Sequence, residues 1–277
     1  MTQARIPLAG VIGSPIAHSR SPQLHRHWLL TYGIRGYYIP MDVAHDDLKQ
    51  VIRALPRMGF VGVNITVPHK ERVMEMADKV TDRATLIGAA NTLIFRDDGS
   101  IHADNTDGYG FIENLRSGAP DWDAKAGPAV ALGAGGAARA VIASLSDAGV
   151  PQIILSNRTR ARAERLRDDF GQRVRVVDWV QAGNVLEEAA LVVNTTSLGM
   201  SGQPELRVPL DGLPKSAVVT DLVYSPLKTH LLQVAEDMGC TTVDGLGMLL
   251  HQAVPAFERW FGYRPTVDED TRAAALR

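Results

Sequence analysis

Short apolar runs and longer amphipathic stretches alternate along the chain, separated by turn residues. In the first part of the chain, apolar or alternating runs predict strands at Ile6–Ile12, Tyr37–Val43, Phe60–Thr66, Thr92–Phe95 and Ile101–Ala103. Helices are predicted between them, from the Ser21-Pro22 pair, over Asp46–Leu55, and from Pro68 to Lys79. This alternation is typical of an α/β unit.

The later runs are more uniformly apolar, as in strands that are buried on both faces. They predict strands at Ala129–Leu132, Gln152–Ser156, Val174–Trp179, Ala190–Asn194, Ala217–Leu222 and Thr241–Val243. Helical spacing predicts helices at Ala137–Leu145, Arg160–Phe170, Thr229–Met238 and Gly245–Gly262. Because parallel strands need crossover helices, the fold class is expected to be α/β, with two open, mostly parallel sheets and a domain boundary near Asp107.

A glycine turn, GAGGAA, joins the strand Ala129–Leu132 to the helix that follows it. Gly133 and Gly135 let the backbone turn sharply and approach a pyrophosphate, and the small Ala138 lets the helix pack close to the strand. The pyrophosphate would then bind N–H groups at the positive end of the helix. A glycine turn before any helix looks similar. The spacing alone therefore does not distinguish a dinucleotide site from an ordinary turn.

The next strand ends in polar residues, two of them arginines, at the place where a dinucleotide-binding fingerprint has its ribose-binding residue. These residues are Asn157, Arg158, Thr159 and Arg160, and no acidic residue accompanies them. Arginine binds phosphate through charge-assisted, often bidentate hydrogen bonds, which suits the ribose 2′-phosphate of NADP. The alternative is that Arg158, Arg160 and Arg162 form the solvated face of the next helix.

Composition narrows the possible functions. The 277 residues, 45% of them hydrophobic, are enough for about two domains. The apolar runs stop well short of the ~20 residues of a membrane span, and Met1–Leu8 lacks the apolar core of a signal peptide. We therefore expect a cytoplasmic protein with no membrane partner. The formal net charge of −2, with no basic block, predicts no nucleic-acid partner.

Cysteine and potential metal ligands are sparse. Cys240 is the single cysteine, which forbids an internal disulfide and fits a reducing compartment. Its apolar neighbours predict a buried, inert thiol. Histidines and carboxylates show no HExxH or paired-ligand spacing, so no metal site is expected.

Several residues of the first half are candidates for chemistry. Lys70, in the first turn of its predicted helix, opposes the helix dipole, and such a cation is either functional or an ordinary surface lysine. Asp107 stands just before a helix and could be its N-cap, a role that does not exclude a second one. Ser21 before Pro22 reads as a helix N-cap. Ser19 is not needed for that cap, so the two hydroxyls could instead hold a polyhydroxylated ligand.

Two residues of the second half stand out in the same way. Thr195 lies at the carboxyl end of a buried strand, where open α/β sheets bind ligands. Gln252 is a polar residue inside the apolar pattern of the long last helix. It therefore either satisfies buried backbone groups or faces a ligand.

Taken in order, nine motifs make the pattern more specific than any one of them. They are AHSRSP, NITVPHK, GAANTL, DNTDG, GAGGAAR, NRT, NTTSLGM, DLVY and DGLGMLLHQA. In this order the chain resembles the shikimate dehydrogenase family over nearly its whole length. The resemblance implies an NADP-dependent oxidoreductase that reversibly reduces 3-dehydroshikimate to shikimate in aromatic amino-acid biosynthesis.

The resemblance also implies two domains and a role for individual residues in each. Residues 1–106 and 244–277 would form a substrate-binding catalytic domain, and residues 107–243 a Rossmann-like NADP-binding domain. Lys70 and Asp107 would be the catalytic pair. The substrate would be bound by these two residues and by Ser19, Ser21, Thr66, Asn91, Tyr224 and Gln252. The cofactor would be bound by Asp82, Gly133, Ala134, Gly135, Gly136, Ala137, Asn157, Arg158, Thr159, Arg160, Arg162, Thr195, Leu222 and Gly245.

Related functions stay open at this stage. A paralogue acting on quinate or on an aminoshikimate, or a non-catalytic NADP-binding sensor, would share the fold. Ser21 favours shikimate, because quinate-preferring relatives tend to carry threonine there. Intact Lys70 and Asp107 argue against a sensor. The family contains both monomers and homodimers, so the oligomeric state is left open.

Overall fold

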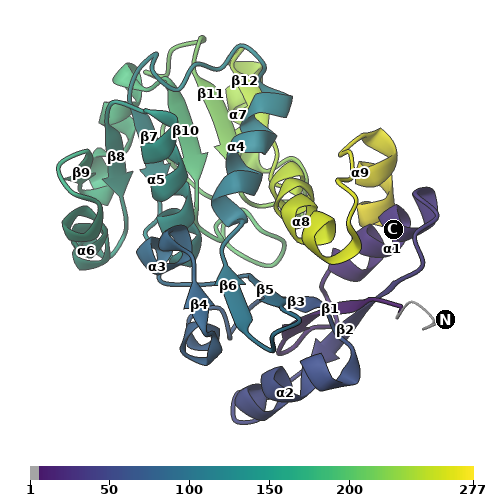
Figure 1. The fold of residues 1–277 in the computed structure, drawn as a ribbon. Helices are drawn as coiled ribbons and strands as arrows, with labels where there is room; N and C mark the ends of the chain where they lie inside the picture. Colours follow the sequence, from purple (N-terminus) through teal and green to yellow (C-terminus); the bar gives the residue numbers. More distant parts are fainter. Residues whose placement is uncertain (1–5) are drawn as a thin grey trace. The chain divides into compact units, whose positions relative to one another are not determined.

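The computed structural model describes residues 6–277, which divide into two compact units (Figure 1). Unit 1 comprises residues 6–106 and 250–277, and unit 2 comprises Asp107–Leu249. Residues 1–5, which belong to the first predicted domain and to the segment considered as a signal peptide, lie outside the described residues. None of the helices in residues 6–277 combines the length and apolar character that a membrane span requires.

Unit 1 is built on a six-stranded sheet with the strand order β2-β1-β3-β5-β6-β4. Its strands are β1 (Leu8–Gly13), β2 (Tyr37–Asp42), β3 (Gly62–Ile65), β4 (Lys79–Val80), β5 (Thr92–Phe95) and β6 (Ile101–Asp104). Its helices are α1 (Ser21–Thr31), α2 (Leu48–Ala54), α3 (Asp82–Ile87) and α9 (Glu269–Leu276), with the 3-10 helices η1 (Leu55–Met58) and η2 (Arg72–Met76). Helix α8 (Leu246–Phe261) carries the chain from unit 2 back into unit 1.

Two strand pairs of this sheet, β3 with β5 and β5 with β6, are antiparallel, and the other three are parallel. The turn between β5 and β6 explains the second antiparallel pair. Gly99 has a φ of +83°, and the Arg96 N–H bonds the Ser100 carbonyl at 3.0 Å. So short a connection can join only antiparallel strands. The expectation of mostly parallel sheets is confirmed, with these two exceptions.

Both faces of this sheet are covered by apolar side chains. On one face, Leu48 and Ile52 of α2 pack with Ile12, Val63 and Leu93. On the other face, Ala256 and Trp260 of α8 pack with Ala9, Val11 and Tyr38 of β1 and β2. The sequence analysis expected the last helix to pack on the first half of the chain. Its C-terminal part does so, since it contributes to the core of unit 1.

The helix predicted from Pro68 to Lys79 is wrong. A turn occupies residues 67–71, η2 follows, and Lys79 already belongs to β4, which pairs with β6. Val73 is the one buried residue of η2, so the segment lacks the repeating apolar stripe that holds a longer helix against a core. Lys70 therefore lies in a turn and does not face the start of an α-helix.

Unit 2 contains a six-stranded sheet in which all five strand pairs are parallel. Its order, β9-β8-β7-β10-β11-β12, is that of a doubly wound dinucleotide-binding fold. The strands are β7 (Ala129–Leu132), β8 (Ile153–Ser156), β9 (Val174–Val177), β10 (Leu191–Asn194), β11 (Val218–Asp221) and β12 (Thr241–Val243). The helices are α4 (Asp107–Gly118), α5 (Gly136–Ala148), α6 (Arg160–Phe170) and α7 (His230–Asp237), with η3 (Trp179–Gln181) and η4 (Gly183–Glu188).

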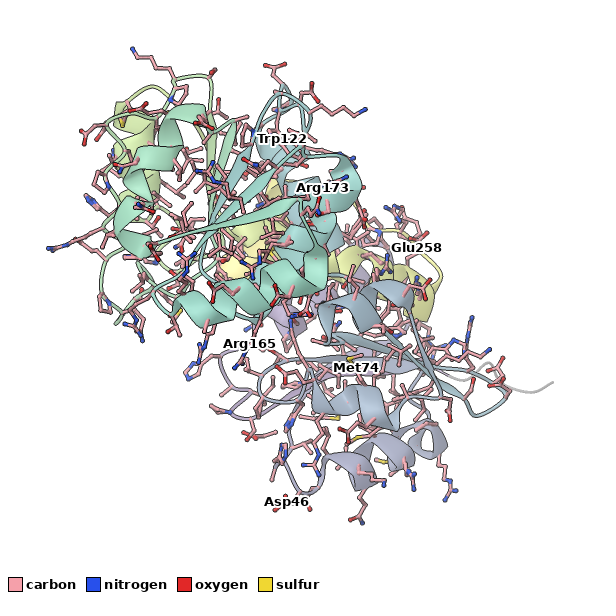
Figure 2. All side chains as sticks on the ribbon, turned by 90° about the vertical axis from the view of Figure 1, so that its left-hand side faces the viewer. Asp46, Met74, Trp122, Arg165, Arg173 and Glu258 are labelled. Atoms are coloured by element: carbon pink, nitrogen blue, oxygen red, sulfur yellow. The ribbon has the colours of Figure 1, made fainter. Side chains whose placement is uncertain are left out.

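Apolar side chains pack on both faces of this sheet, as the uninterrupted apolar strands predicted. Helices α4, α5 and α6 cover one face, with Phe111, Val141 and Leu166 fully or almost fully buried. Segment η4 and helix α7 cover the other face, where the Cys240 side chain is buried as well. Helix α6 buries Ala163 and Leu166 and exposes charged residues such as Arg165, which points away from the ribbon in Figure 2.

Candidate functional site

The glycine turn lies where the strand order of unit 2 reverses. Strands β7 and β10 are neighbours there, and their connections leave in opposite directions, which is the position where open α/β sheets bind ligands. Gly133 follows β7 with a φ of +114°, a backbone conformation that favours glycine. Gly135 is the N-cap of α5 and has an extended conformation without a side-chain cap. Its place at the helix start is that of an anion-binding turn.

The three glycines of this turn differ in what a side chain would meet. A Cβ at Gly133 would come within 2.6 Å of Thr196 Cγ2 and 2.7 Å of Thr195 Oγ1, so the fold itself excludes a side chain there. A Cβ at Gly135 or Gly136 would have no atom within 4 Å. Protein packing therefore does not explain these two glycines. A ligand that approaches the start of α5 closely, as a pyrophosphate would, does explain them.

Side chains that follow β8 and β10, the two strands on either side of β7, hold the turn. The Thr195 hydroxyl lies 2.9 Å from the Leu132 carbonyl and 3.1 Å from the Gly133 carbonyl, which are its possible acceptors. The Ala134 N–H donates to Asn157 Oδ1 at 3.1 Å, and Asn157 Nδ2 donates to the Thr159 carbonyl at 2.8 Å. Thr195 and Asn157, both predicted to bind cofactor, thus shape the turn from β10 and β8.

The predicted arginines separate into two kinds. Arg160, the first residue of α6, donates to Asp178 at 2.6 Å and to Glu164 at 2.9 Å. Arg158 and Arg162 are exposed and make no ion pair with the described residues. The sequence analysis missed Asp178, because this carboxylate comes from the end of β9 and no local spacing links it to Arg160. Arg158 and Arg162 are therefore better placed than Arg160 to meet a phosphate.

A second polar cluster holds the ends of β10 and β11. The buried Asp221 carboxylate accepts hydrogen bonds from Asn194 Nδ2 at 2.9 Å and from the Thr229 hydroxyl at 2.7 Å. Burial raises the pKa of Asp221, and hydrogen bonds from Val223 and Thr229 oppose that rise. This carboxylate was not predicted from the sequence. It also accepts the Val223 N–H at 2.9 Å, which fixes the backbone just before Tyr224.

Leu222 and Gly245 lie in the same part of unit 2. Leu222 is half-buried and packs on the core that α4, α5 and α6 form with the sheet. A Cβ at Gly245 would lie 2.3 Å from the Leu222 carbonyl oxygen, so Gly245 is glycine because two backbone segments meet there. Their predicted place beside the nicotinamide stays a prediction.

In unit 1, helix α1 starts differently from the prediction. Ser21 is its first residue, its N-cap is Arg20, and no side chain caps it. The prediction of Ser21 as N-cap is therefore wrong, because burial against Tyr38 takes its hydroxyl elsewhere. Burial raises the pKa of Tyr38, and a hydrogen bond from Ser21 partly offsets that rise. Ser19 is close by, since its hydroxyl accepts the Ser21 N–H at 3.4 Å.

Thr66, Lys70 and Asn91 come together at the ends of β3 and β5. The Thr66 N–H donates to the Ile12 carbonyl at 2.9 Å, which holds Thr66 beside β1. The Ala90 N–H donates to the Lys70 carbonyl at 2.8 Å, which places Lys70 beside the residue preceding Asn91. The side chains of Thr66 and Lys70 are half-buried.

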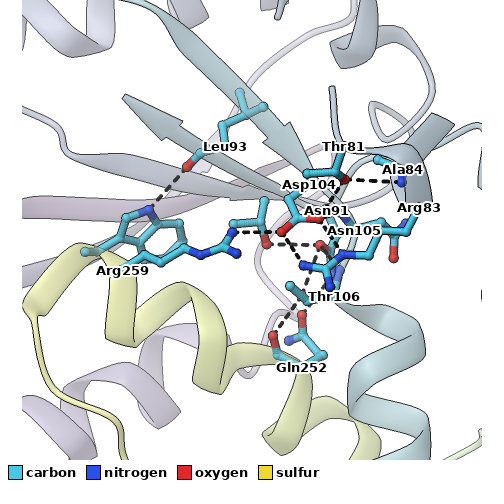
Figure 3. A network of polar contacts seen from close by, with 12 residues as sticks. Thr81, Arg83, Ala84, Asn91, Leu93, Asp104, Asn105, Thr106, Gln252 and Arg259 are labelled. Atoms are coloured by element: carbon cyan, nitrogen blue, oxygen red, sulfur yellow. Dashed lines mark hydrogen bonds and ion pairs between the residues drawn. The ribbon is translucent and has the colours of Figure 1, made fainter. Parts of the chain in front are cut away.

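Figure 3 shows how Asn91 and Gln252, distant in sequence, are joined. Asn91 Nδ2 donates to Gln252 Oε1 at 3.1 Å. Asn91 Oδ1 accepts from the Thr106 N–H at 2.9 Å and from the Thr92 hydroxyl at 3.0 Å. These donors fix which way the Asn91 amide points, and Asn91 in turn orients Gln252. The structure thus brings together two residues that were predicted separately as substrate ligands.

Asp104, which the sequence analysis missed as a site residue, is the centre of the network in Figure 3. It ends β6, is 1% exposed, and accepts hydrogen bonds from Arg83, Arg259 and Thr81. Burial alone would raise the pKa of Asp104, but the hydrogen bonds from Arg83 and Arg259 outweigh burial and lower it to about 2.

The lowered pKa predicts an acid-dependent loss of stability. A pKa that falls from 3.8 to about 2 on folding contributes about 2 kcal/mol, present above pH 4 and lost as the pH falls through 2. In urea unfolding at pH 5 and pH 2.5, Asp104→Asn is expected to lose less unfolding free energy than the wild type. An equal loss in both proteins would contradict the pKa shift.

The remaining predicted residues are placed as follows. Asp107 is the first residue of α4, in unit 2, where a carboxylate is favoured by the helix dipole. Asp82 is the first residue of α3 and is exposed. Lys70 and Asp107 belong to different units, so their catalytic pairing remains a proposal. Within residues 6–277 no group of three His, Cys, Asp or Glu side chains is arranged to hold a metal ion.

Three family models match successive parts of the chain. Residues 11–93 match the shikimate dehydrogenase substrate binding domain, residues 120–200 match shikimate / quinate 5-dehydrogenase, and residues 245–274 match the shikimate 5′-dehydrogenase C-terminal domain. A similar curated protein is the shikimate dehydrogenase (NADP(+)) of a Ruegeria species. It is 71% identical over 276 residues, which cover 100% of both chains.

Two solved structures extend the comparison. Shikimate 5-dehydrogenase from Thermus thermophilus, in complex with NADP(H) and shikimate, is 36% identical with a TM-score of 0.85 and covers 98% of each chain. Quinate dehydrogenase from Corynebacterium glutamicum, in complex with NAD, is 34% identical with a TM-score of 0.90, covering 98% of this chain and 99% of that one. The sequence, the folds of both units and these matches agree, and the chain belongs to the shikimate dehydrogenase family.

Proposed function

We propose that this chain catalyses the reversible, NADP-dependent interconversion of 3-dehydroshikimate and shikimate, with Lys70 and Asp107 as its catalytic pair. The observation that carries the proposal is the joined pair of amides, Asn91 and Gln252, close in the fold to Lys70. A primary amide offers both a donor and an acceptor, as neighbouring ring hydroxyls require. Relatives 63–72% identical over nearly the whole chain carry the name of this activity.

The chemistry of the reaction assigns different tasks to the two catalytic residues. NADPH, when bound, supplies the hydride that reduces the C3 carbonyl. The ammonium group of Lys70 stabilises the negative charge that develops on the C3 oxygen and donates a proton to it. The Asp107 carboxylate holds that ammonium group in position. In the oxidation of shikimate the same pair accepts the proton.

Substrate recognition would divide between hydroxyl and amide side chains. Ser19, Ser21 and Tyr224 would hydrogen-bond the substrate carboxylate. Thr66, Asn91 and Gln252 would bind the ring hydroxyls. The fixed orientation of Asn91 favours this role, because its carbonyl is already satisfied by Thr92 and Thr106. An amide that cannot flip discriminates between a donor and an acceptor on its ligand.

The cofactor would bind at the carboxyl ends of β7, β8 and β10. The turn over Gly133, Ala134, Gly135, Gly136 and Ala137 fits a pyrophosphate, since α5 starts there with an open approach. Arg158 and Arg162 would bind the 2′-phosphate, with Asn157, Thr159 and Thr195 shaping the site and Arg160 held by Asp178. Asp82, Leu222 and Gly245 would lie near the cofactor.

The alternatives are less favoured. The quinate dehydrogenase solved in complex with NAD is 34% identical to this chain, about half the identity of the curated shikimate dehydrogenase (NADP(+)) of the Ruegeria species. An acidic residue near the ribose site, Asp178, is paired with Arg160 rather than placed alone as an NAD site requires. A cytoplasmic location, where NADPH is available, fits the lone cysteine of the chain.

A side-by-side kinetic assay tests the proposed function. With shikimate, NADP reduction is expected to exceed NAD reduction in kcat/KM by at least ~10²-fold, since a phosphate–arginine contact is lost with NAD. With NADP, shikimate is expected to be preferred over quinate. Preference for quinate or NAD would favour the paralogue, and an absence of absorbance change with all four pairs would favour a sensor.

A further inference from the structure

We propose that Arg259 and Asp104 are positioning residues that set the substrate-facing amides of Asn91 and Gln252. The inference rests on the proposed function of those two amides. It starts from an observation that the reaction itself does not explain. A carboxylate that is 1% exposed is held by two arginines, Arg83 and Arg259, far apart in the sequence.

The three residues that end and follow β6 each fix a different part of the site (Figure 3). The Asp104 carboxylate accepts the Asn105 N–H at 2.8 Å, and Asn105 Nδ2 donates to the Ala89 carbonyl at 2.9 Å. The Thr106 N–H donates to Asn91 Oδ1, and its hydroxyl lies 2.8 Å from the Gln252 carbonyl. Asp104 therefore sets the path of a segment that contacts both amide residues.

Helix α8 is held to this segment at two points. Gln252 and Arg259 are seven residues apart, which is about two helical turns, so they lie on the same face with a rise of about 10 Å between them. Thr106 contacts the helix at Gln252, and Asp104 accepts from Arg259 Nη1 at 2.7 Å. Two contacts on one face fix how far the helix is rotated and shifted along its axis, and thereby where the Gln252 amide lies.

The helix needs an anchor at its C-terminal part for a local reason. Pro255 lies inside α8, between the two contact points. Proline has no N–H and cannot donate the backbone hydrogen bond to the previous turn, so the helix is weakest there. The Arg259–Asp104 pair, together with the bond from Trp260 Nε1 to the Leu93 carbonyl at 3.2 Å, fixes the helix beyond that point.

Arg259 is the residue to change, because its loss leaves Asp104 still paired. Asp104 keeps both hydrogen bonds from Arg83 and the one from Thr81. Arg259 itself is 42% exposed, so its removal opens no cavity. Arg259→Met is therefore expected to fold. Arg264→Met is a matched control, because it removes an exposed ion pair with Glu258 of the same helix.

The test is steady-state kinetics with shikimate and NADP varied separately. Arg259→Met is expected to raise KM for shikimate about tenfold while kcat and KM for NADP change less than about twofold, because substrate and transition state lose the same contacts. Arg259→Lys is expected to recover part of the loss, because an ammonium group can reach one carboxylate oxygen. Arg264→Met is expected to match the wild type.

A double-mutant cycle tests whether Arg259 acts through Asp104. KM for shikimate in Asp104→Asn/Arg259→Met should be no higher than in Asp104→Asn alone. If the wild type is active and Arg259→Met leaves KM for shikimate unchanged, the inference is overturned. A fall in kcat and melting temperature at constant KM, which is the signature of a purely structural role, overturns it as well. A wild type inactive with shikimate and NADP would instead refute the proposed function.

Discussion

Lys70→Ala is expected to lower kcat by about 10³-fold while KM for NADP changes less than about twofold. Lys70 both stabilises the developing oxyanion and donates a proton to it, and each effect contributes about 10²- to 10⁴-fold to the rate. Lys70 belongs to unit 1 and the glycine turn to unit 2, so the variant leaves the proposed pyrophosphate site itself unchanged. Steady-state kinetics in both directions measure the effect.

Two further variants separate charge from proton transfer at this position. Lys70→Arg keeps a positive charge but is a poor proton donor near neutral pH, so it is expected to restore substrate binding more than turnover. Lys49→Ala removes an exposed lysine of α2 in the same unit and should behave as the wild type. A Lys70→Ala enzyme with undiminished kcat would end the assignment of Lys70 as the proton donor.

Gly135→Ala is expected to raise KM for NADP by about tenfold or more without lowering the melting temperature. The added methyl group would meet no protein atom within 4 Å, and the backbone of Gly135 is extended, so alanine fits the fold. The same methyl group would occupy the space through which a pyrophosphate approaches the start of α5. Cofactor titration by fluorescence and thermal unfolding measure the two quantities separately.

Gly133→Ala is the contrasting variant. Its φ of +114° and the close approach of Thr195 and Thr196 should make it lose stability, on the order of 1 kcal/mol or more, whether or not cofactor is present. KM for shikimate should stay near the wild-type value in Gly135→Ala. If Gly135→Ala bound NADP as tightly as the wild type, the glycine turn would not be the pyrophosphate site.

The sequence predicted those features that depend on local patterns. Apolar runs located nearly every strand of unit 2, and the GAGGAA spacing located the turn at the point where the strand order reverses. The polar position of Gln252 inside an apolar helix marked it as a residue in need of a partner, and Asn91 is that partner. In each case a few neighbouring residues carry the whole signal.

Features that depend on distant residues could not be predicted in this way. Asp104 could not be identified as a site residue, because its partners Arg83 and Arg259 lie on α3 and α8 and no spacing links them. The N-cap predicted at Ser21 fails because tertiary burial beside Tyr38 overrides a local preference. The prediction of a helix from Pro68 to Lys79 fails because Lys79, the last residue of that helix, belongs to β4, which pairs with β6.

The arrangement of Lys70 and Asp107 around the substrate is the central claim, and a crystal structure of the chain with NADP and shikimate tests it most directly. We expect Lys70 Nζ within about 3 Å of both the C3 oxygen of shikimate and an Asp107 carboxylate oxygen, opposite the nicotinamide. A complex in which the Lys70 side chain points away from the C3 oxygen, with another group in its place, would contradict the account.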